Sequence, residues 1–222
     1  MAKPSKIYRL LEFPQLYSLI QKILVPEAEL LLKRKFRHIF DKSRSLVLDL
    51  GCGPASPLQL PDATVVGVDS NPLYVRKYVS IKRKNRFFCI GKCNGQQNRL
   101  GCVCSAIALP FRDNAFDETR CLGVFHHLDK NSVLSAIKEM IRCTGPRGRI
   151  ILFDSVWPRV PFYRPLAWLL CYFDRGKWML REEELLELVN TAYPKRWQGR
   201  RFTYTFTGLE GLFLTAQKAP NE

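Results

Sequence analysis

The sequence lacks any apolar run close to 20 residues, the length that a helix needs to cross a lipid bilayer. Its first six residues, MAKPSK, lack the apolar core of a secretory signal peptide. Internal repeats and low-complexity tracts are also absent. We therefore expect a protein without a transmembrane segment, located in the cytoplasm.

Acidic residues are scarce, since 20 Asp and Glu oppose 35 Lys and Arg and give a formal net charge of +15. No acid lies between Asp69 and Asp113, and further basic clusters occupy residues 33–37 and 195–201. Such runs form either an ordinary solvated surface or one that attracts an anionic partner. That partner would be RNA, a phosphorylated substrate or a membrane surface, although the nearby aromatics form no RNA-binding signature.

A disulfide framework is not expected for the eight cysteines, because cytoplasmic thiols stay reduced. Four of them, Cys89, Cys93, Cys102 and Cys104, lie close enough in sequence to consider a zinc site. They lack a paired C-x2-C spacing, and Cys102 and Cys104 fall on one face of a predicted strand. We therefore predict reduced cysteines and no metal.

The most informative stretch is residues 47–55, in which an apolar run reaches Asp49 and then turns at Gly51 and Gly53. It predicts a buried parallel strand that leads into a ligand-facing loop, because glycine admits unusual φ values and close approach. A second predicted strand ends in Asp69, whose carboxylate can accept hydrogen bonds from both ribose hydroxyls. Together they predict a nucleoside-containing cofactor at the carboxyl edge of a parallel sheet.

The dinucleotide-binding pattern G-x-G-x-x-G is incomplete in this loop. Its final glycine is missing, and Pro54 and Pro57 follow the first two glycines. Asp49 precedes the loop, where its charge would repel a pyrophosphate and attract an ammonium group. The sequence therefore argues against a dinucleotide cofactor.

Five motifs follow one another in an order that resembles the class I S-adenosylmethionine-dependent methyltransferase family, with a methyltransferase type 11-like domain. They are D-L-G-C-G-P-A at 49–55, V-D-S-N-P at 68–72, L-P-F-x4-F-D at 109–117, G-V-F-H-H-L at 123–128 and G-P-R-G-R at 145–149. The resemblance covers about residues 45–155. It implies an α/β fold: a Rossmann-like three-layer α/β/α sandwich with a mostly parallel seven-stranded sheet and a C-terminal antiparallel hairpin. It also implies a transferase that uses S-adenosyl-L-methionine and releases S-adenosyl-L-homocysteine.

The resemblance also implies which residues contact the cofactor. The methionine part would be held by Asp49 and the backbone of Gly51, Cys52 and Gly53, and the ribose by Asp69. The adenine would be bordered by Ser70, Ser105 and Ala106. The sulfonium would lie beside Gly123 and Val124. Ser105 stands where family members often carry aspartate, and its hydroxyl can accept the same hydrogen bond without the charge-assisted strength. Ser105 and Ala55, at family-typical Asp and Gly positions, keep open a non-catalytic cofactor-binding partner subunit.

His126 and His127 follow the predicted fourth strand, beside the position that the resemblance implies for the sulfonium. A neutral imidazole there can remove a proton from an acceptor hydroxyl or amine, so both are candidate catalytic bases. The alternative is that they only shape the pocket. Signatures for methylating exocyclic amino groups (Asn/Asp-Pro-Pro-Tyr) or attacking cytosine (Pro-Cys) are absent after this strand.

We expect one methyltransferase domain over residues 1–222. Residues 1–44 would form a helical cap that covers the sheet, lines the acceptor pocket or lies on a membrane surface. Residues 45–155 would form the cofactor-binding core, and residues 156–222 the substrate side with the terminal β-hairpin. The aromatic stretch at 157–173 is typical of a pocket for an apolar acceptor or of a packing helix. We predict a small-molecule or lipid-like acceptor, with RNA or a protein as the alternative.

Periodicity predicts the remaining elements. Helices are expected at 73–84, 131–143 and 181–192, strands at 102–106, 118–125, 149–154, 202–207 and 212–217, and turns at 145–148 and 208–211. The core face of the second helix would comprise Val133, Leu134, Ile137, Met140 and Ile141.

Overall fold

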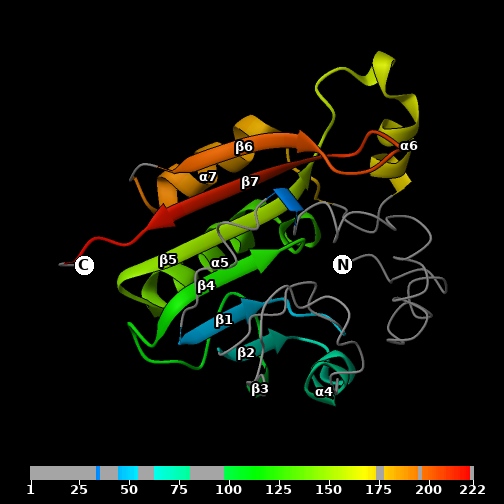
Figure 1. The fold of residues 1–222 in the computed structure, drawn as a ribbon. Helices are drawn as coiled ribbons and strands as arrows, with labels where there is room; N and C mark the ends of the chain where they lie inside the picture. The colour runs from blue at the N-terminus through cyan, green and yellow to red at the C-terminus, as the bar shows by residue number, and fades with distance from the viewer. Residues whose placement is uncertain are drawn as a thin grey trace.

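One sheet of seven strands organises the chain (Figure 1), in a computed structural model that describes residues 34–35, 45–54, 63–80, 98–173, 178–194 and 197–220. The strands are β1 (Leu46–Leu50), β2 (Thr64–Asp69), β3 (Asn98–Val103), β4 (Phe116–Leu122), β5 (Thr144–Val156), β6 (Gln198–Thr203) and β7 (Glu210–Gln217). Their order across the sheet is β3-β2-β1-β4-β5-β7-β6. Strands β1 to β5 pair in parallel, whereas β7 runs antiparallel to both β5 and β6. The predicted mostly parallel sheet with a C-terminal antiparallel hairpin is confirmed.

The strand order reverses at β1, which pairs with β2 on one side and with β4 on the other. Ligands of open parallel sheets bind at such a reversal, beyond the carboxyl ends of the strands. In Figure 1 the arrowheads of β4 and β5 point toward the side of the molecule on which helix α6 lies. The candidate site is therefore expected on this side.

Helices pack on both faces of the sheet. They are α4 (Pro72–Ser80), α5 (Lys130–Cys143), α6 (Pro165–Phe173) and α7 (Glu182–Ala192), with short 3-10 turns η2 (Phe125–His127) and η3 (Pro161–Tyr163). Because alternate strand residues face opposite sides, Leu48 and Leu50 join the core under α5 and α7, whereas Val47 joins the other core. That second core includes Tyr78 of α4 and Ala167 of α6. The result is the predicted three-layer α/β/α sandwich.

Helix α5 shows how local sequence sets one boundary. The Asp129 carboxylate accepts hydrogen bonds from the backbone N–H groups of Asn131 and Ser132, both at 3.0 Å, and so caps the first turn. The predicted helix at 131–143 is confirmed and begins one residue earlier. Three residues of its predicted core face are fully buried and two half-buried, and Ala136 and Cys143 complete that face.

Two predicted strand boundaries on the cofactor side are wrong. Strand β3 ends at Val103 instead of continuing to residue 106, because the chain turns and Ser105 bridges to Ala108. Strand β4 ends at Leu122 instead of Phe125, because Gly123 has a φ of 74°. A left-handed residue cannot continue a strand.

Two further boundaries differ on the other side of the sheet. The turn predicted at residues 145–148 is a bulge inside β5, between the pairs Phe116–Thr144 and Glu118–Arg149. The hairpin strand predicted at 202–207 lies earlier, at β6, because Thr205 Oγ1 accepts from Leu209 N (2.9 Å) and closes a turn. The final strand and the helix predicted at 181–192 are confirmed within two residues.

Several predictions fall outside the described residues. They include nearly all of the N-terminal cap at 1–44, the loop that contains Ala55, the end of the helix predicted at 73–84, and Cys89 with Cys93. Over the described ranges, no group of three His, Cys, Asp or Glu side chains could hold a metal ion, and no disulfide is present. No helix within these ranges is long and apolar enough to span a membrane. The division into three parts stays a prediction.

Candidate cofactor and acceptor site

The loop after β1 brings the ends of three strands together. Gly51 and Gly53 have φ values of 69° and 56°, which favour glycine. The N–H groups of Gly51 and Cys52 donate to Val68 O at 2.8 and 3.0 Å, which fastens the loop to β2. A Cβ on Gly51 would lie only 2.2 Å from Val124 Cγ2. Val124, the second residue after β4, therefore packs directly on the glycine loop.

Asp69, at the end of β2, stabilises this loop through a hydrogen bond. Its Oδ2 accepts from Gly53 N (3.2 Å), and its Oδ1 accepts from Asn71 N (2.9 Å). Burial raises the pKa of Asp69, and backbone hydrogen bonds from Asn71, Gly53 and Ser70 offset only part of that rise. Each carboxylate oxygen can accept more than one hydrogen bond, so Asp69 can brace the loop and still bind a diol.

The residues expected around the adenine lie at the end of β3. Cys104 N donates to Asp69 O at 3.2 Å, which brings the turn after β3 beside the end of β2. Ser105 and Ser70 are exposed there, whereas Ala106 is half-buried against the core. The structure thus brings Ser70 and Ser105 to the same edge as Asp69, and the adenine contact stays a prediction.

A buried row of charges lies under the glycine loop, and sequence reasoning missed it. Asp49 of β1 pairs in register with Arg120 of β4, and both are almost fully buried. Arg120 Nη2 lies 3.4 Å from Glu118 Oε1, and Glu118 also pairs with Arg149. Charged residues in a predicted central strand were the available signal.

Cys52 contributes to the loop through its backbone N–H group, which donates to Val68 O. Burial raises the pKa of its thiol well above the usual range, and the negative charges of Asp49 and Asp69 raise it further. A neutral buried thiol is a poor nucleophile. We therefore assign it no chemistry beyond its N–H group.

Asp154, near the end of β5, forms hydrogen bonds with the segment after β4. Its Oδ2 accepts from Val124 N (3.0 Å) and Phe125 N (2.5 Å), and its Oδ1 from Ser155 N (2.8 Å) and His126 Nδ1 (2.6 Å). The side chain is only 3% exposed. Sequence reasoning used this residue only as the end of a strand, although it is a third acid at a strand end, like Asp49 and Asp69.

The two candidate catalytic histidines lie next to each other in η2. Their ring centroids are 4.0 Å apart and their planes are inclined by 50°. The His126 side chain is mostly buried, at 12% exposed, whereas His127 is exposed. A Cβ on Gly123 would lie 4.0 Å from His126 Cε1, so this imidazole is beside the Gly123 backbone.

These features fit a cofactor with a cationic amine, a diol and a flat ring. Among the described residues, a Cβ built on Gly53 would meet no atom within 4 Å. A buried carboxylate at Asp49 supplies negative charge, and Asp69 supplies acceptors at the adjacent strand end. These carboxylates therefore match the ammonium group and the ribose of S-adenosylmethionine, as the resemblance implies.

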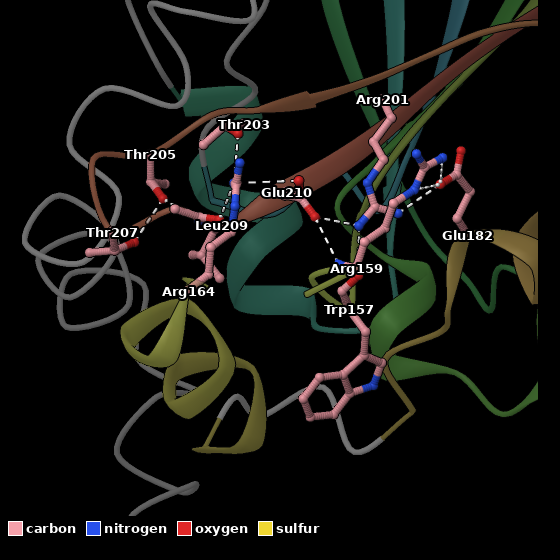
Figure 2. A network of polar contacts seen from close by, with 11 residues as sticks. Trp157, Arg159, Arg164, Glu182, Arg201, Thr203, Thr205, Thr207, Leu209 and Glu210 are labelled. Atoms are coloured by element: carbon pink, nitrogen blue, oxygen red, sulfur yellow. Dashed lines mark hydrogen bonds and ion pairs between the residues drawn. The ribbon is translucent and has the colours of Figure 1, made fainter. Parts of the chain in front are cut away.

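A polar network fixes the segment after β5 to the hairpin and α7 (Figure 2). Arg201 donates to Trp157 O (2.8 Å) and to Glu182 Oε2 (2.7 Å), and it also pairs with Glu210. Arg164 donates to Thr203 Oγ1 at 2.7 Å and to Gly208 O at 2.9 Å. Burial raises the pKa of Glu182, but hydrogen bonds from Arg159 and Arg201 outweigh it and hold the value below its usual range.

The aromatic stretch at 157–173 is partly packed and partly exposed. Ala167 and Cys171 of α6 enter the core, whereas Phe162 and Tyr163 are 86% and 80% exposed. Trp168 and Tyr172 stack with centroids 5.6 Å apart. A mostly apolar hollow of about 750 Å³ is lined by Phe162, Pro165, Leu166, Trp168 and Leu169. The segment thus packs partly as the packing-helix interpretation expects, whereas its role as an acceptor pocket stays a prediction.

Comparison with known proteins points the same way. A family model described as a methyltransferase domain matches residues 48–152. The chain is 36% identical over 121 residues to the probable tRNA methyltransferase 9B of Mus musculus, covering 52% of the chain and 22% of that protein. It is 30% identical over 115 residues to the tRNA (carboxymethyluridine(34)-5-O)-methyltransferase alkbh8 of Xenopus tropicalis, covering 51% and 15%. The chain thus spans less than a quarter of either relative.

The fold has solved counterparts. Human N-acetylserotonin methyltransferase, in complex with S-adenosylmethionine, superposes with a TM-score of 0.65 at 16% identity. The match covers 98% of the chain and 60% of that structure. Since motifs, fold and matched family model agree, residues 48–152 form a class I S-adenosylmethionine-dependent methyltransferase domain, whose cofactor is S-adenosylmethionine.

Proposed function

We propose that the protein transfers a methyl group from S-adenosylmethionine to an RNA acceptor. The observation that carries this proposal is that two relatives named as tRNA methyltransferases match the cofactor-binding half at 36% and 30% identity. The formal charge of +15 supports it, because basic proteins gain affinity for RNA by releasing counterions from the phosphates. The proposal replaces a small molecule with RNA as the favoured acceptor.

The acceptor side carries groups suited to single-stranded RNA. Arg159, Arg181 and Trp168 line a hollow of about 170 Å³ together with Glu182 and Glu183, and Trp168 also lines the larger apolar hollow. The exposed rings of Phe162 and Tyr163 lie in the same segment. Unpaired bases stack on aromatic side chains, while arginines contact phosphates.

The proposed roles of the cofactor-side residues follow from their positions. Asp49 attracts the methionine ammonium, the backbone of Gly51 to Gly53 lets the methionine part approach, and Asp69 accepts from the ribose. Ser70, Ser105 and Ala106 border the adenine, and Gly123 and Val124 border the sulfonium. Bound S-adenosylmethionine supplies a methyl group on positively charged sulfur. The chain contributes position and exclusion of water, which account for much of the acceleration in such transfers.

A lipid-like or other small apolar acceptor is the second candidate. The apolar hollow in front of α6 favours it, because ligand sites are concave and mostly apolar. Salt separates the two candidates: RNA methylation should fall steeply as ionic strength rises, whereas transfer to an apolar molecule should change little.

The test uses purified protein, methyl-labelled S-adenosylmethionine, and bulk tRNA or a lipid extract as acceptor. Nuclease-sensitive, acid-precipitable label is the expected result, with loss in Asp69→Ala and retention in the matched control Asp113→Asn, whose side chain is 72% exposed. Label in the organic phase would favour the lipid-like acceptor. Cofactor binding without transfer to either would favour a non-catalytic partner subunit.

A further inference from the structure

Asp154 receives four hydrogen bonds although it is almost fully buried. Three come from the backbone N–H groups of Val124, Phe125 and Ser155, which can only donate. The fourth partner is His126 Nδ1 at 2.6 Å. An ionised carboxylate can only accept, so with Asp154 ionised the fourth bond must be donated by His126 Nδ1.

This constraint fixes the protonation of one imidazole nitrogen. His126 Nδ1 carries a proton toward Asp154 in both the neutral and the charged ring. In the neutral ring the lone pair is therefore on Nε2, the nitrogen on the other side of Cε1. The carboxylate thereby selects the tautomer, as in serine hydrolases, where a buried aspartate orients the general base.

The same contacts place this ring beside the expected sulfonium. Gly123 N donates to Phe153 O at 2.7 Å, directly before Asp154. The ring's Cε1 lies 4.0 Å from a Cβ built on Gly123. The end of β5 thus determines both the backbone after β4 and the imidazole next to it. His127 lies against the outer side, with its ring 4.0 Å from that of His126.

We propose that Asp154 is a positioning residue that holds His126, rather than His127, as the general base of the reaction. The proposal rests on the proposed function insofar as it needs an acceptor with an O–H or N–H group. The acceptor atom passes its proton to His126 Nε2 and uses the lone pair to bond the methyl carbon. The carbon–sulfur bond breaks, its electron pair stays on sulfur, and Asp154 stabilises the imidazolium.

The first test is spectroscopic and needs no acceptor. The chain contains three histidines, so long-range proton–nitrogen spectra are simple to assign with His126→Gln and His127→Gln. The wild type should show His126 protonated at Nδ1 and unprotonated at Nε2. Asp154→Asn should move the proton to Nε2, because the asparagine amide can donate to Nδ1. S-adenosylhomocysteine should shift the His126 Hε1 signal more than the His127 signal.

The second test measures transfer of labelled methyl groups to bulk tRNA. His126→Gln and Asp154→Asn should each lower kcat by about 100-fold or more, as expected for a general base. The double variant should be no worse than either single one, because the two residues act as a unit. His127→Gln should lose at least tenfold less than His126→Gln. Binding of S-adenosylhomocysteine, measured by calorimetry, should persist in Asp154→Asn and so show that the site still folds.

Three outcomes would overturn the assignment. They are a wild-type His126 protonated at Nε2, an Asp154→Asn variant that keeps the Nδ1–H form, and unchanged kcat in either variant. Absence of RNA methylation by the wild type would instead contradict the proposed function. In that case the tautomer and the response to S-adenosylhomocysteine still decide whether Asp154 positions His126 beside the cofactor.

Discussion

Asp49 and Arg120 lie opposite each other on neighbouring parallel strands, and both are buried under the glycine loop. Within the described part of the chain, none of the three guanidinium nitrogens of Arg120 has a hydrogen-bond partner. Its positive charge therefore acts mainly through space, on Asp49 and on Glu118, which is 3.4 Å away. The acid that we assign to the cofactor amine is balanced from within the sheet.

Arg120→Met should destabilise the fold by about 3 kcal/mol, because removing one member of a buried ion pair leaves the other charges uncompensated. Urea denaturation would measure the loss. Exposed Arg112→Met is the matched control and should stay within about 0.5 kcal/mol of wild type. Equal stability of Arg120→Met and wild type would mean that the desolvation cost of Arg120 cancels its attraction to the acids.

Gly51→Ala and Gly53→Ala should differ although both glycines have positive φ. Left-handed strain costs each variant about 1–2 kcal/mol. The Cβ of Gly51→Ala would also clash with a side chain, at 2.2 Å from Val124 Cγ2, whereas that of Gly53→Ala would meet no atom of the described residues within 4 Å. Thermal melts without cofactor should show the larger loss for Gly51→Ala. Adding Val124→Ala should restore part of it, and no recovery would show that the clash is not the cause.

Asp69→Asn should weaken cofactor binding and change the stability of the apo fold little. A hydrogen bond to a charged group contributes about 1.5–3 kcal/mol, so affinity for S-adenosylhomocysteine should fall roughly tenfold to a hundredfold. Because burial raises the folded-state pKa of Asp69, ionisation there opposes folding. This loss of folding free energy is absent at pH values below the unfolded-state pKa of Asp69. It is complete at pH values above its folded-state pKa.

The Asn substitution removes this penalty at neutral pH but leaves the N–H of Gly53 or Asn71 without its acceptor, so the two effects offset each other and the apo melting temperature should change little. Calorimetric titration and melting curves measure the two effects on one preparation. Undiminished affinity would contradict the ribose role of Asp69.

Acid should loosen the segment after β5. The pKa values of Glu182 and Glu210 lie below the usual value of a glutamate, since hydrogen bonds from arginines outweigh the effect of burial. A carboxylate whose pKa is lower in the folded state stabilises the fold at any pH above its unfolded-state pKa. That stabilisation is lost as the pH falls through its folded-state pKa. The fluorescence of Trp157 and Trp168 should therefore change as the pH drops below the folded-state pKa values of Glu182 and Glu210. Glu182→Gln should reduce the pH dependence, and an unaltered pH profile would contradict this role.

The parts of the fold that could be predicted are those with a local signature. The glycine loop, the acids at the ends of β1 and β2, and helix α5 each combine periodicity with a turn or cap in adjacent residues. Arg120 and Asp154 could not be assigned, because their significance comes from neighbours in other strands. The strand at 202–207 was misplaced for a related reason: its alternation continues into a turn that Thr205 closes by accepting from Leu209 N.

The position of β7 has a consequence for synthesis of the chain. Among the described strands, β6 pairs only with β7, which lies between β5 and β6 although it follows both in sequence. During translation β6 therefore has no place in the sheet until residue 217 has left the ribosome. Its backbone groups stay unpaired for that interval, which exposes the nascent chain to mispairing. Release of the last strand, and not of the cofactor motifs, then sets the time at which the sheet is complete.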